Sequence, residues 1–171
     1  VPDIPHFEEV YGLKPLCIAT YPMYRGLARL IGMNAPALKG DIREEIDFLK
    51  TNYNDYDFFF LHVKKVDSYA EDGNFEGKVS KIEEFDSILP EVIGLNPDVL
   101  IITGDHSTPS VLKSHSWHPV PLLLKSPYVI GNTCKAFTER ECIKGELGIF
   151  PTVNLMPLAL ANAGRLKKFG A

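Results

Sequence analysis

The chain has 171 residues, of which 45% are hydrophobic and 23% charged, as is typical of one globular domain. The net charge of −4, with acidic and basic residues interspersed, argues against nucleic acid or an anionic membrane as a partner. No apolar run is long enough for a membrane span, and no signal-peptide pattern is present. The three cysteines lack metal-type spacing, which predicts reduced thiols and a cytoplasmic location.

The first third of the chain predicts a strand followed by a helix. Residues 1–15 are Pro-rich and polar, as expected of a loop or short helix, and residues 16–19 form a short apolar run. Periodic apolar residues then predict a helix that ends near Gly32. Arg25 stands early in that helix. Because a strand-to-helix junction binds anions well, Arg25 is a candidate phosphate ligand, with a solvated surface arginine as the alternative.

A second helix is predicted over residues 41–53, and residues 57–63 have the composition of a buried strand. Polar residues follow this strand directly, among them Lys64, Asp67 and Glu71. In isolation, the Asp- and Gly-containing segment favours a turn. A cluster of carboxylates at the end of the strand is the alternative.

The remaining elements complete an alternating pattern. Periodic apolar residues predict helices over 76–88 and 151–165, whereas 119–124 indicates a short strand near a sheet edge and 125–150 is expected to be irregular. Strands that alternate with helices predict an α/β fold with a mostly parallel sheet covered on both faces. No Gly-rich phosphate loop is present, so nucleotide binding of that kind is not supported.

The most informative stretch is residues 99–118. The apolar run 99–102 predicts a buried strand that stops at Gly104, and Asp105 and His106 follow at once. Open α/β sheets bind ligands outside the carboxyl ends of their strands. With His115 nearby, this mixture of carboxylate and imidazole suits Zn²⁺ or Mn²⁺. The alternative is a helix N-cap formed by the Ser-Thr-Pro that follows His106.

These residues resemble a known family. Asp-His-Ser-Thr-Pro (105–109) and His-Ser-Trp-His-Pro-Val-Pro (115–121) are similar to motifs of the archaeal-type, cofactor-independent phosphoglycerate mutases of the alkaline phosphatase superfamily. The resemblance extends to Tyr-Pro-Met-Tyr-Arg-Gly-Leu-Ala (21–28), His-Val-Lys-Lys-Val-Asp (62–67) and the ending 158–165. It implies a three-layer α/β/α fold with an alkaline-phosphatase-like core that lacks its N-terminal segment, so that residues 1–171 are the C-terminal portion of the domain.

The resemblance also implies a two-metal site, with Mn or Zn as the ions and no 2,3-bisphosphoglycerate as cofactor. Asp67 and His115 would hold one ion, and Asp105 and His106 the other. A serine expected upstream would form a phosphoserine while 2-phosphoglycerate and 3-phosphoglycerate interconvert in glycolysis and gluconeogenesis. Arg25 and Lys64 are weaker candidates for binding the small-molecule substrate, and His118 would support the site from behind the ligands.

Two departures from the family pattern stand out. Glu71 occupies the position, four residues after Asp67, where many relatives have histidine, so it is either a substitute ligand or a solvent-facing residue. The family's N-terminal section, with the serine, has no counterpart here, and we expect this portion alone to be inactive and to require that section as its partner. Another phosphohydrolase of the superfamily and a non-catalytic metal-binding module are the alternative functions. The oligomeric state is left open by the sequence.

Overall fold

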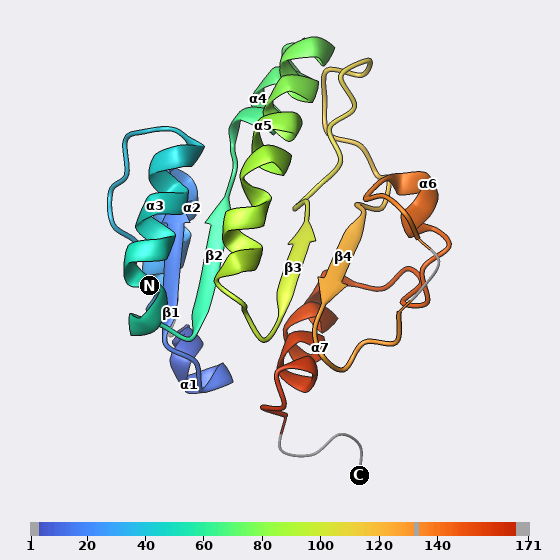
Figure 1. The fold of residues 1–171 in the computed structure, drawn as a ribbon. Helices are drawn as coiled ribbons and strands as arrows, with labels where there is room; N and C mark the ends of the chain where they lie inside the picture. Colours follow the sequence, from blue (N-terminus) through green and yellow to red (C-terminus); the bar gives the residue numbers. More distant parts are fainter. Residues whose placement is uncertain (1–3, 132–133, 167–171) are drawn as a thin grey trace. The chain divides into compact units, whose positions relative to one another are not determined.

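The computed structural model describes residues 4–131 and 134–166, and the chain divides into two units, residues 1–95 and 96–171 (Figure 1). In the first unit, strand β1 (Pro15–Ala19) pairs in parallel with strand β2 (Phe58–His62). All five residues of β1 are buried. On its other side, the backbone N–H of Cys17 donates to the carbonyl of Asn34 at 2.7 Å. Strand β1 is therefore the centre of this unit, as its apolar sequence predicts.

Helices α2 (Pro22–Leu30) and α3 (Ile42–Asn52) both pack against β1. The Asp41 carboxylate caps α3 by accepting the backbone N–H groups of residues 43 and 44, which satisfies donors at the helix start. The sequence predicts that Ile42, Ile46, Phe48 and Leu49, the apolar stripe of α3, face inward, and the structure buries all of these except Phe48, which is half-buried. Shorter elements of this unit are the helix α1 (Phe7–Tyr11) and the 3₁₀ helix η1 (Tyr53–Asp55).

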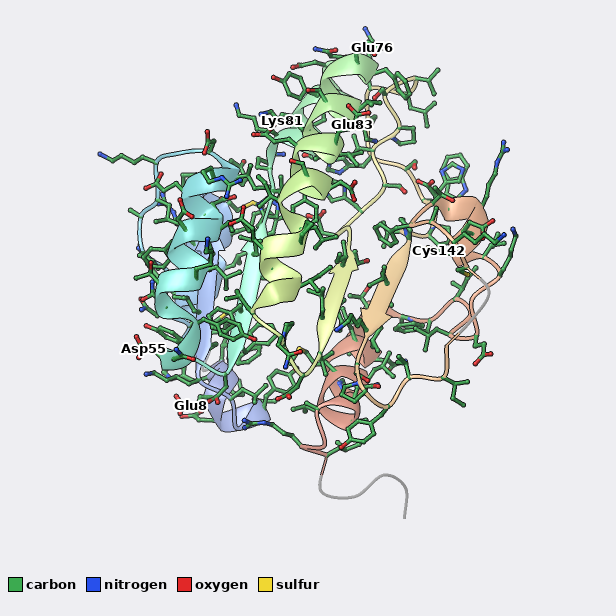
Figure 2. All side chains as sticks on the ribbon, in the orientation of Figure 1. Glu8, Asp55, Glu76, Lys81, Glu83 and Cys142 are labelled. Atoms are coloured by element: carbon green, nitrogen blue, oxygen red, sulfur yellow. The ribbon has the colours of Figure 1, made fainter. Side chains whose placement is uncertain are left out.

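The polar segment after β2 forms a helix, so the prediction of a turn there is wrong. Helix α4 covers Lys65–Glu71 and is followed by the long helix α5 (Phe75–Gly94). The turn-forming residues end α4 instead of replacing it. Gly73 has a φ of 73°, and the Asn74 side chain caps α5 by accepting the N–H of Gly77. Charged side chains of α5, such as Glu76 and Glu83, are exposed (Figure 2).

Helix α5 continues through Pro90 to Gly94, so the segment after residue 88, for which the sequence allows either an extension or a restart of the helix, extends it. The two sides of the proline are tied to the rest of the unit. Ile88 and Val92 are buried, and Glu91 accepts hydrogen bonds from Arg43 and Lys50 of α3. These contacts hold the helix where its sequence favours a break.

In the second unit, β3 (Leu100–Thr103) and β4 (Leu122–Lys125) pair antiparallel, so the parallel arrangement does not extend to this pair. The segment predicted to be irregular contains the short helix α6 (Glu139–Cys142). The last predicted helix is shorter than expected, because a 3₁₀ turn, η2 (Thr152–Asn154), precedes α7 (Leu155–Asn162) and Gly164 adopts a φ of 67°. Helices and strands alternate along the chain, which confirms the α/β class.

None of the helices in the described residues combines the length and the apolar composition that crossing a membrane requires. Cys17, Cys134 and Cys142 form no disulfide bonds in the part of the chain that the structure describes, in agreement with the predicted thiols.

Candidate active site

Asp105 and His106 follow β3 closely, two and three residues beyond its last residue, Thr103. The Asp105 carboxylate accepts the backbone N–H of His106 at 3.1 Å. Its second oxygen lies 3.5 Å from Nε2 of the His106 imidazole. The end of β3 therefore presents a carboxylate and an imidazole side by side, as the sequence predicts for a ligand site at a strand end.

The chain brings His115 back to His106. An antiparallel bridge joins Ser107 to Ser116, whose backbone N–H donates to the Ser107 carbonyl at 2.9 Å. As a result, the rings of His106 and His115 lie against each other, with their centroids 3.8 Å apart and their planes tilted by 31°. Each ring offers a nitrogen within 4.8 Å of one on the other, a spacing at which both imidazoles could bind the same ion or adjacent ions.

A buried hydroxyl fixes the orientation of the His106 ring. Nδ1 of His106 lies 3.0 Å from Oγ1 of Thr108, which is only 6% exposed. When Nδ1–H donates to this hydroxyl, the lone pair of Nε2 faces away from Thr108 and is available to a metal. The sequence offers Thr108 only as part of a possible helix N-cap. That alternative is wrong, since no helix occurs in the described chain between β3 and β4.

His118 is held by its own loop. Its Nδ1 lies 2.9 Å from the Ser116 hydroxyl, and its ring stacks on Trp117 with centroids 4.8 Å apart. His118 and Trp117 are both exposed. Ser116, which forms the bridge that brings His115 to His106, thus also orients His118.

The first unit groups three of the predicted residues on α4 and at its N-cap. The Lys64 ammonium contacts the Asp67 carboxylate and lies 4.0 Å from Oε2 of Glu71. Asp67 and Glu71 are four residues apart, so the helix places both on one face. Desolvation lowers the pKa of Lys64, but its hydrogen bond to Asp67 and the negative charges of Asp67 and Glu71 together outweigh this and leave the pKa raised. Two carboxylates thus already hold a cation between them.

Arg25 lies in the first half of α2, as predicted. Its Nε is buried and has no hydrogen-bond partner in the described structure. A buried, unsatisfied guanidinium N–H is costly, and an anion is the ligand that would satisfy it. Arg25 therefore has the donor that a phosphate or carboxylate ligand requires.

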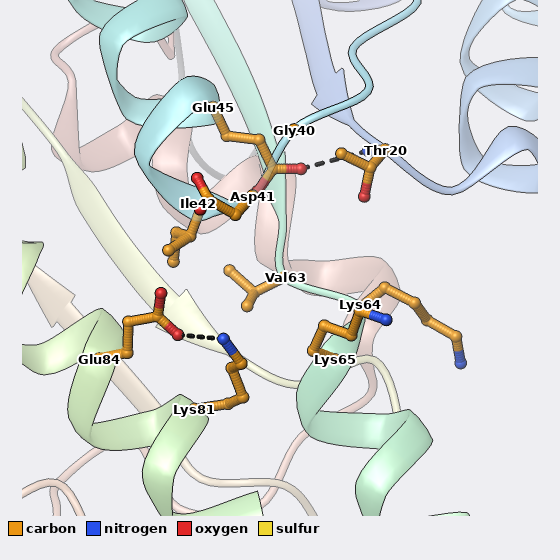
Figure 3. Close-up of a pocket in the computed structure, with 10 residues that line it drawn as sticks. All are labelled: Thr20, Gly40, Asp41, Ile42, Glu45, Val63, Lys64, Lys65, Lys81 and Glu84. Carbon is orange, nitrogen blue, oxygen red and sulfur yellow. Dashed lines mark hydrogen bonds and ion pairs between the residues drawn. The ribbon is translucent and has the colours of Figure 1, made fainter. Parts of the chain in front are cut away.

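The sequence analysis missed Glu45, which is 3% exposed. It belongs to a cavity of about 120 Å³ at the carboxyl ends of β1 and β2, whose polar lining includes Thr20, Lys64 and Lys81 (Figure 3). Desolvation by burial raises the pKa of the Glu45 carboxyl to about 7, against hydrogen bonds from Thr20 that lower it. A glutamate among the apolar positions of a helix is the signal that could have identified it.

Comparison with known proteins places this site in a family. Residues 1–162 match the Metalloenzyme superfamily. The chain belongs to this superfamily. It is 65% identical over 171 residues to a probable 2,3-bisphosphoglycerate-independent phosphoglycerate mutase of Aquifex aeolicus, and 56% identical over 173 residues to one of Thermus thermophilus. In both comparisons 99% of this chain is covered, but only 42% and 43% of the relative, so the chain spans less than half the length of these superfamily members.

Two solved structures are similar to this chain. The PH0037 protein of Pyrococcus horikoshii is 31% identical with a TM-score of 0.87, covering all of this chain and 54% of that one. The cofactor-independent phosphoglycerate mutase of Thermoplasma acidophilum is 25% identical with a TM-score of 0.77, covering 96% of this chain and 40% of that one. Both the predicted α/β fold and the resemblance to this mutase family are thereby confirmed.

Proposed function

We propose that this chain is part of a 2,3-bisphosphoglycerate-independent phosphoglycerate mutase, which interconverts 2-phosphoglycerate and 3-phosphoglycerate through a phosphoserine intermediate. The observation that carries the proposal is the group formed by Asp105, His106 and His115 at the end of β3. The relatives named as such mutases support the choice among metal-dependent reactions. The nucleophilic serine would come from outside this chain, and the free cysteines fit a cytoplasmic enzyme.

The donor set fits two divalent ions. Asp105 and His106 would hold one, with Nε2 of His106 as the nitrogen ligand. Asp67, Glu71 and His115 would hold the other, and Mn²⁺ or Zn²⁺ suits both mixtures of carboxylate and imidazole. The position of the Lys64 ammonium between Asp67 and Glu71 supports this, because it shows that the two carboxylates accept a positive charge there. When bound, such ions neutralise phosphoryl oxygens and lower the pKa of an attacking hydroxyl.

Lys64 and Arg25 would bind the substrate. A divalent ion at Asp67 and Glu71 would compete with the Lys64 ammonium for these carboxylates, which would free that ammonium for the phosphate or carboxylate of phosphoglycerate. Arg25 would supply its unsatisfied Nε–H to the same class of ligand. Both residues would act by holding the substrate rather than by transferring protons.

The test uses the protein expressed from its complete gene. We expect interconversion of the two phosphoglycerates without added 2,3-bisphosphoglycerate and about two bound divalent ions per chain. His115→Ala and Asp67→Asn should each remove about one ion and lower kcat by at least about 100-fold. Asp72→Asn is the matched control for Asp67→Asn, since it changes an exposed carboxylate close by, and His6→Ala is the control for His115→Ala, since it changes an exposed histidine outside the site.

Two other outcomes would contradict the mutase proposal. Release of inorganic phosphate without isomerisation would assign a phosphohydrolase of the same superfamily. Tight binding of two ions with no turnover of either phosphoglycerate would assign a non-catalytic metal-binding module. Loss of both ions on dialysis of the complete protein would contradict the metal assignment itself.

A further inference from the structure

Glu45 is a buried carboxylate in an apolar setting. Within the described residues it is the one charged side chain that is classed as buried, and it lies on α3 beside Ile42, Ile46 and Leu49. An apolar residue would continue the stripe, whereas a buried carboxylate costs folding free energy unless hydrogen bonds satisfy it. The hydrogen bonds of the Glu45 carboxylate therefore indicate its structural role.

The contacts of Glu45 reach the turn between β1 and α2. Its Oε1 accepts the backbone N–H of Thr20 at 3.2 Å (Figure 3), and the Thr20 hydroxyl donates to the same carboxylate. Thr20 follows the last residue of β1, and Tyr21 is the N-cap residue of α2. A carboxylate on α3 thus anchors the segment that leads from β1 into the helix bearing Arg25.

The same turn supports Lys64. The Lys64 ammonium lies 5.3 Å from the centre of the Tyr21 ring, a cation–π contact, while it also contacts Asp67. Thr20 and Lys64 line the cavity that contains Glu45 and also a second cavity of about 300 Å³ on the Tyr21 side. Lys81 is another lysine that lines the first cavity, and its ammonium forms an ion pair with Glu84.

We propose that Glu45 is a positioning residue, which fixes Thr20 and Tyr21 and through the Tyr21 ring holds the Lys64 ammonium in place. The consequence for substrate binding rests on the proposed function, in which Lys64 binds phosphoglycerate. The mechanical link from Glu45 to Lys64 does not depend on that function. Two experiments therefore test these claims separately: the first tests the link from Glu45 to Lys64, and the second tests its consequence for substrate binding.

The first experiment measures the accessibility of Lys64 without any assay of activity. The rate at which an amine-acylating reagent modifies Lys64 is followed by peptide mass spectrometry, with Lys14 as the internal reference. Glu45→Leu removes the acceptor but suits the apolar stripe, and we expect it to raise the rate at Lys64 about tenfold, which corresponds to the loss of one hydrogen bond to a charged group. Glu45→Gln keeps an acceptor oxygen and should leave the rate close to that of the wild type.

Ile46→Val is the matched control, because it loosens the packing of the next residue on α3 without touching Thr20. An unchanged rate at Lys64 in Glu45→Leu, or an equal increase in Ile46→Val, would overturn the proposal. Tyr21→Leu provides a second route should Glu45→Leu fold poorly. It removes the ring under the ammonium and should raise the Lys64 rate by a similar factor, whereas no increase would refute the link.

The second experiment measures kinetics in the protein from its complete gene. Glu45→Leu should raise KM for phosphoglycerate about tenfold and leave kcat within about twofold, because a misplaced Lys64 weakens binding in the ground and transition states alike. Combined with Lys64→Met, it should add nothing further, since both changes remove the same interaction. Additive losses would contradict the proposal. A wild type without mutase activity would instead refute the proposed function and leave the labelling result to decide the link.

Discussion

Replacement of Glu45 by Gln should change how the stability of the protein depends on pH. The buried carboxyl has a pKa of about 7 in the folded state, against an ordinary value of 4.5. The folded state therefore binds more protons than the unfolded state between these values, so the free energy of unfolding falls as pH rises through this range. Above about pH 7 the full penalty, about 3 kcal/mol, is present.

Gln cannot ionise, yet its amide oxygen can still accept the Thr20 N–H. From about pH 5 to about pH 8, we expect the free energy of unfolding of Glu45→Gln to increase by about 2 kcal/mol relative to that of the wild type. Urea denaturation followed by circular dichroism at both pH values measures the difference. Glu83→Gln, which removes an exposed carboxylate of α5, corrects for the general effect of lost charge. A difference between Glu45→Gln and wild type that is independent of pH would refute the reasoning.

Three further predictions concern other residues. Burial raises the pKa of the Cys17 thiol to about 11, so at about pH 8 its thiolate population is about 100-fold below that of an ordinary thiol. Iodoacetamide should therefore label Cys134 and Cys142 in the native protein, but Cys17 only after unfolding. Hydrogen bonds from Arg43 and, to a smaller extent, Lys50 lower the pKa of Glu91 to about 2, so Glu91→Gln should destabilise the protein near neutral pH. In urea titrations, this loss of stability should disappear as the pH falls from 4.5 towards 2, and also in high salt. Calorimetry should show that Glu71→Gln weakens the binding of one divalent ion at least tenfold, whereas Glu71→His should retain binding and favour Zn²⁺ over Mn²⁺. If Glu71→Gln binds the ion as tightly as the wild type, Glu71 is not a ligand.

The sequence predicts where the strands lie and which face of α3 is apolar, because apolar residue types mark both. It overestimates burial, since of the strands predicted to be buried only β1 is fully buried, whereas β2 and β3 are mostly half-buried. Residues 16–19 are apolar without interruption and form the fully buried β1, and the spacing of Ile42, Ile46 and Leu49 corresponds to one helical face. Pro90 shows the limit of such local signals. It favours a break, but the burial of Ile88 and Val92 on either side keeps α5 continuous, and tertiary packing leaves no local trace in the sequence.

The segment after β2 shows a different limit. Its Asp and Gly residues favour a turn by composition, but the residues that stop a helix also belong to turns, and only the left-handed conformation of Gly73 and the cap at Asn74 separate the two cases. The difference matters for the site. In a turn, the spacing of Asp67 and Glu71 would have no fixed meaning, whereas on α4 it places the two carboxylates on one face with Lys64 between them.

Each of the two groups of candidate ligands is built by a different kind of local structure. A helical spacing of four residues pairs the carboxylates of the first unit, while a β-bridge between Ser107 and Ser116 brings together the imidazoles of the second. The residue types alone are sufficient to predict the chemistry, since Asp, Glu and His are ligands in either conformation. The residue types do not predict how the candidate ligands are oriented, because their orientation depends on neighbouring groups that do not themselves bind metals. Thr108 orients His106 and Glu45 anchors the turn beside Lys64, and the identity of each became informative only once its burial and its hydrogen bonds were known.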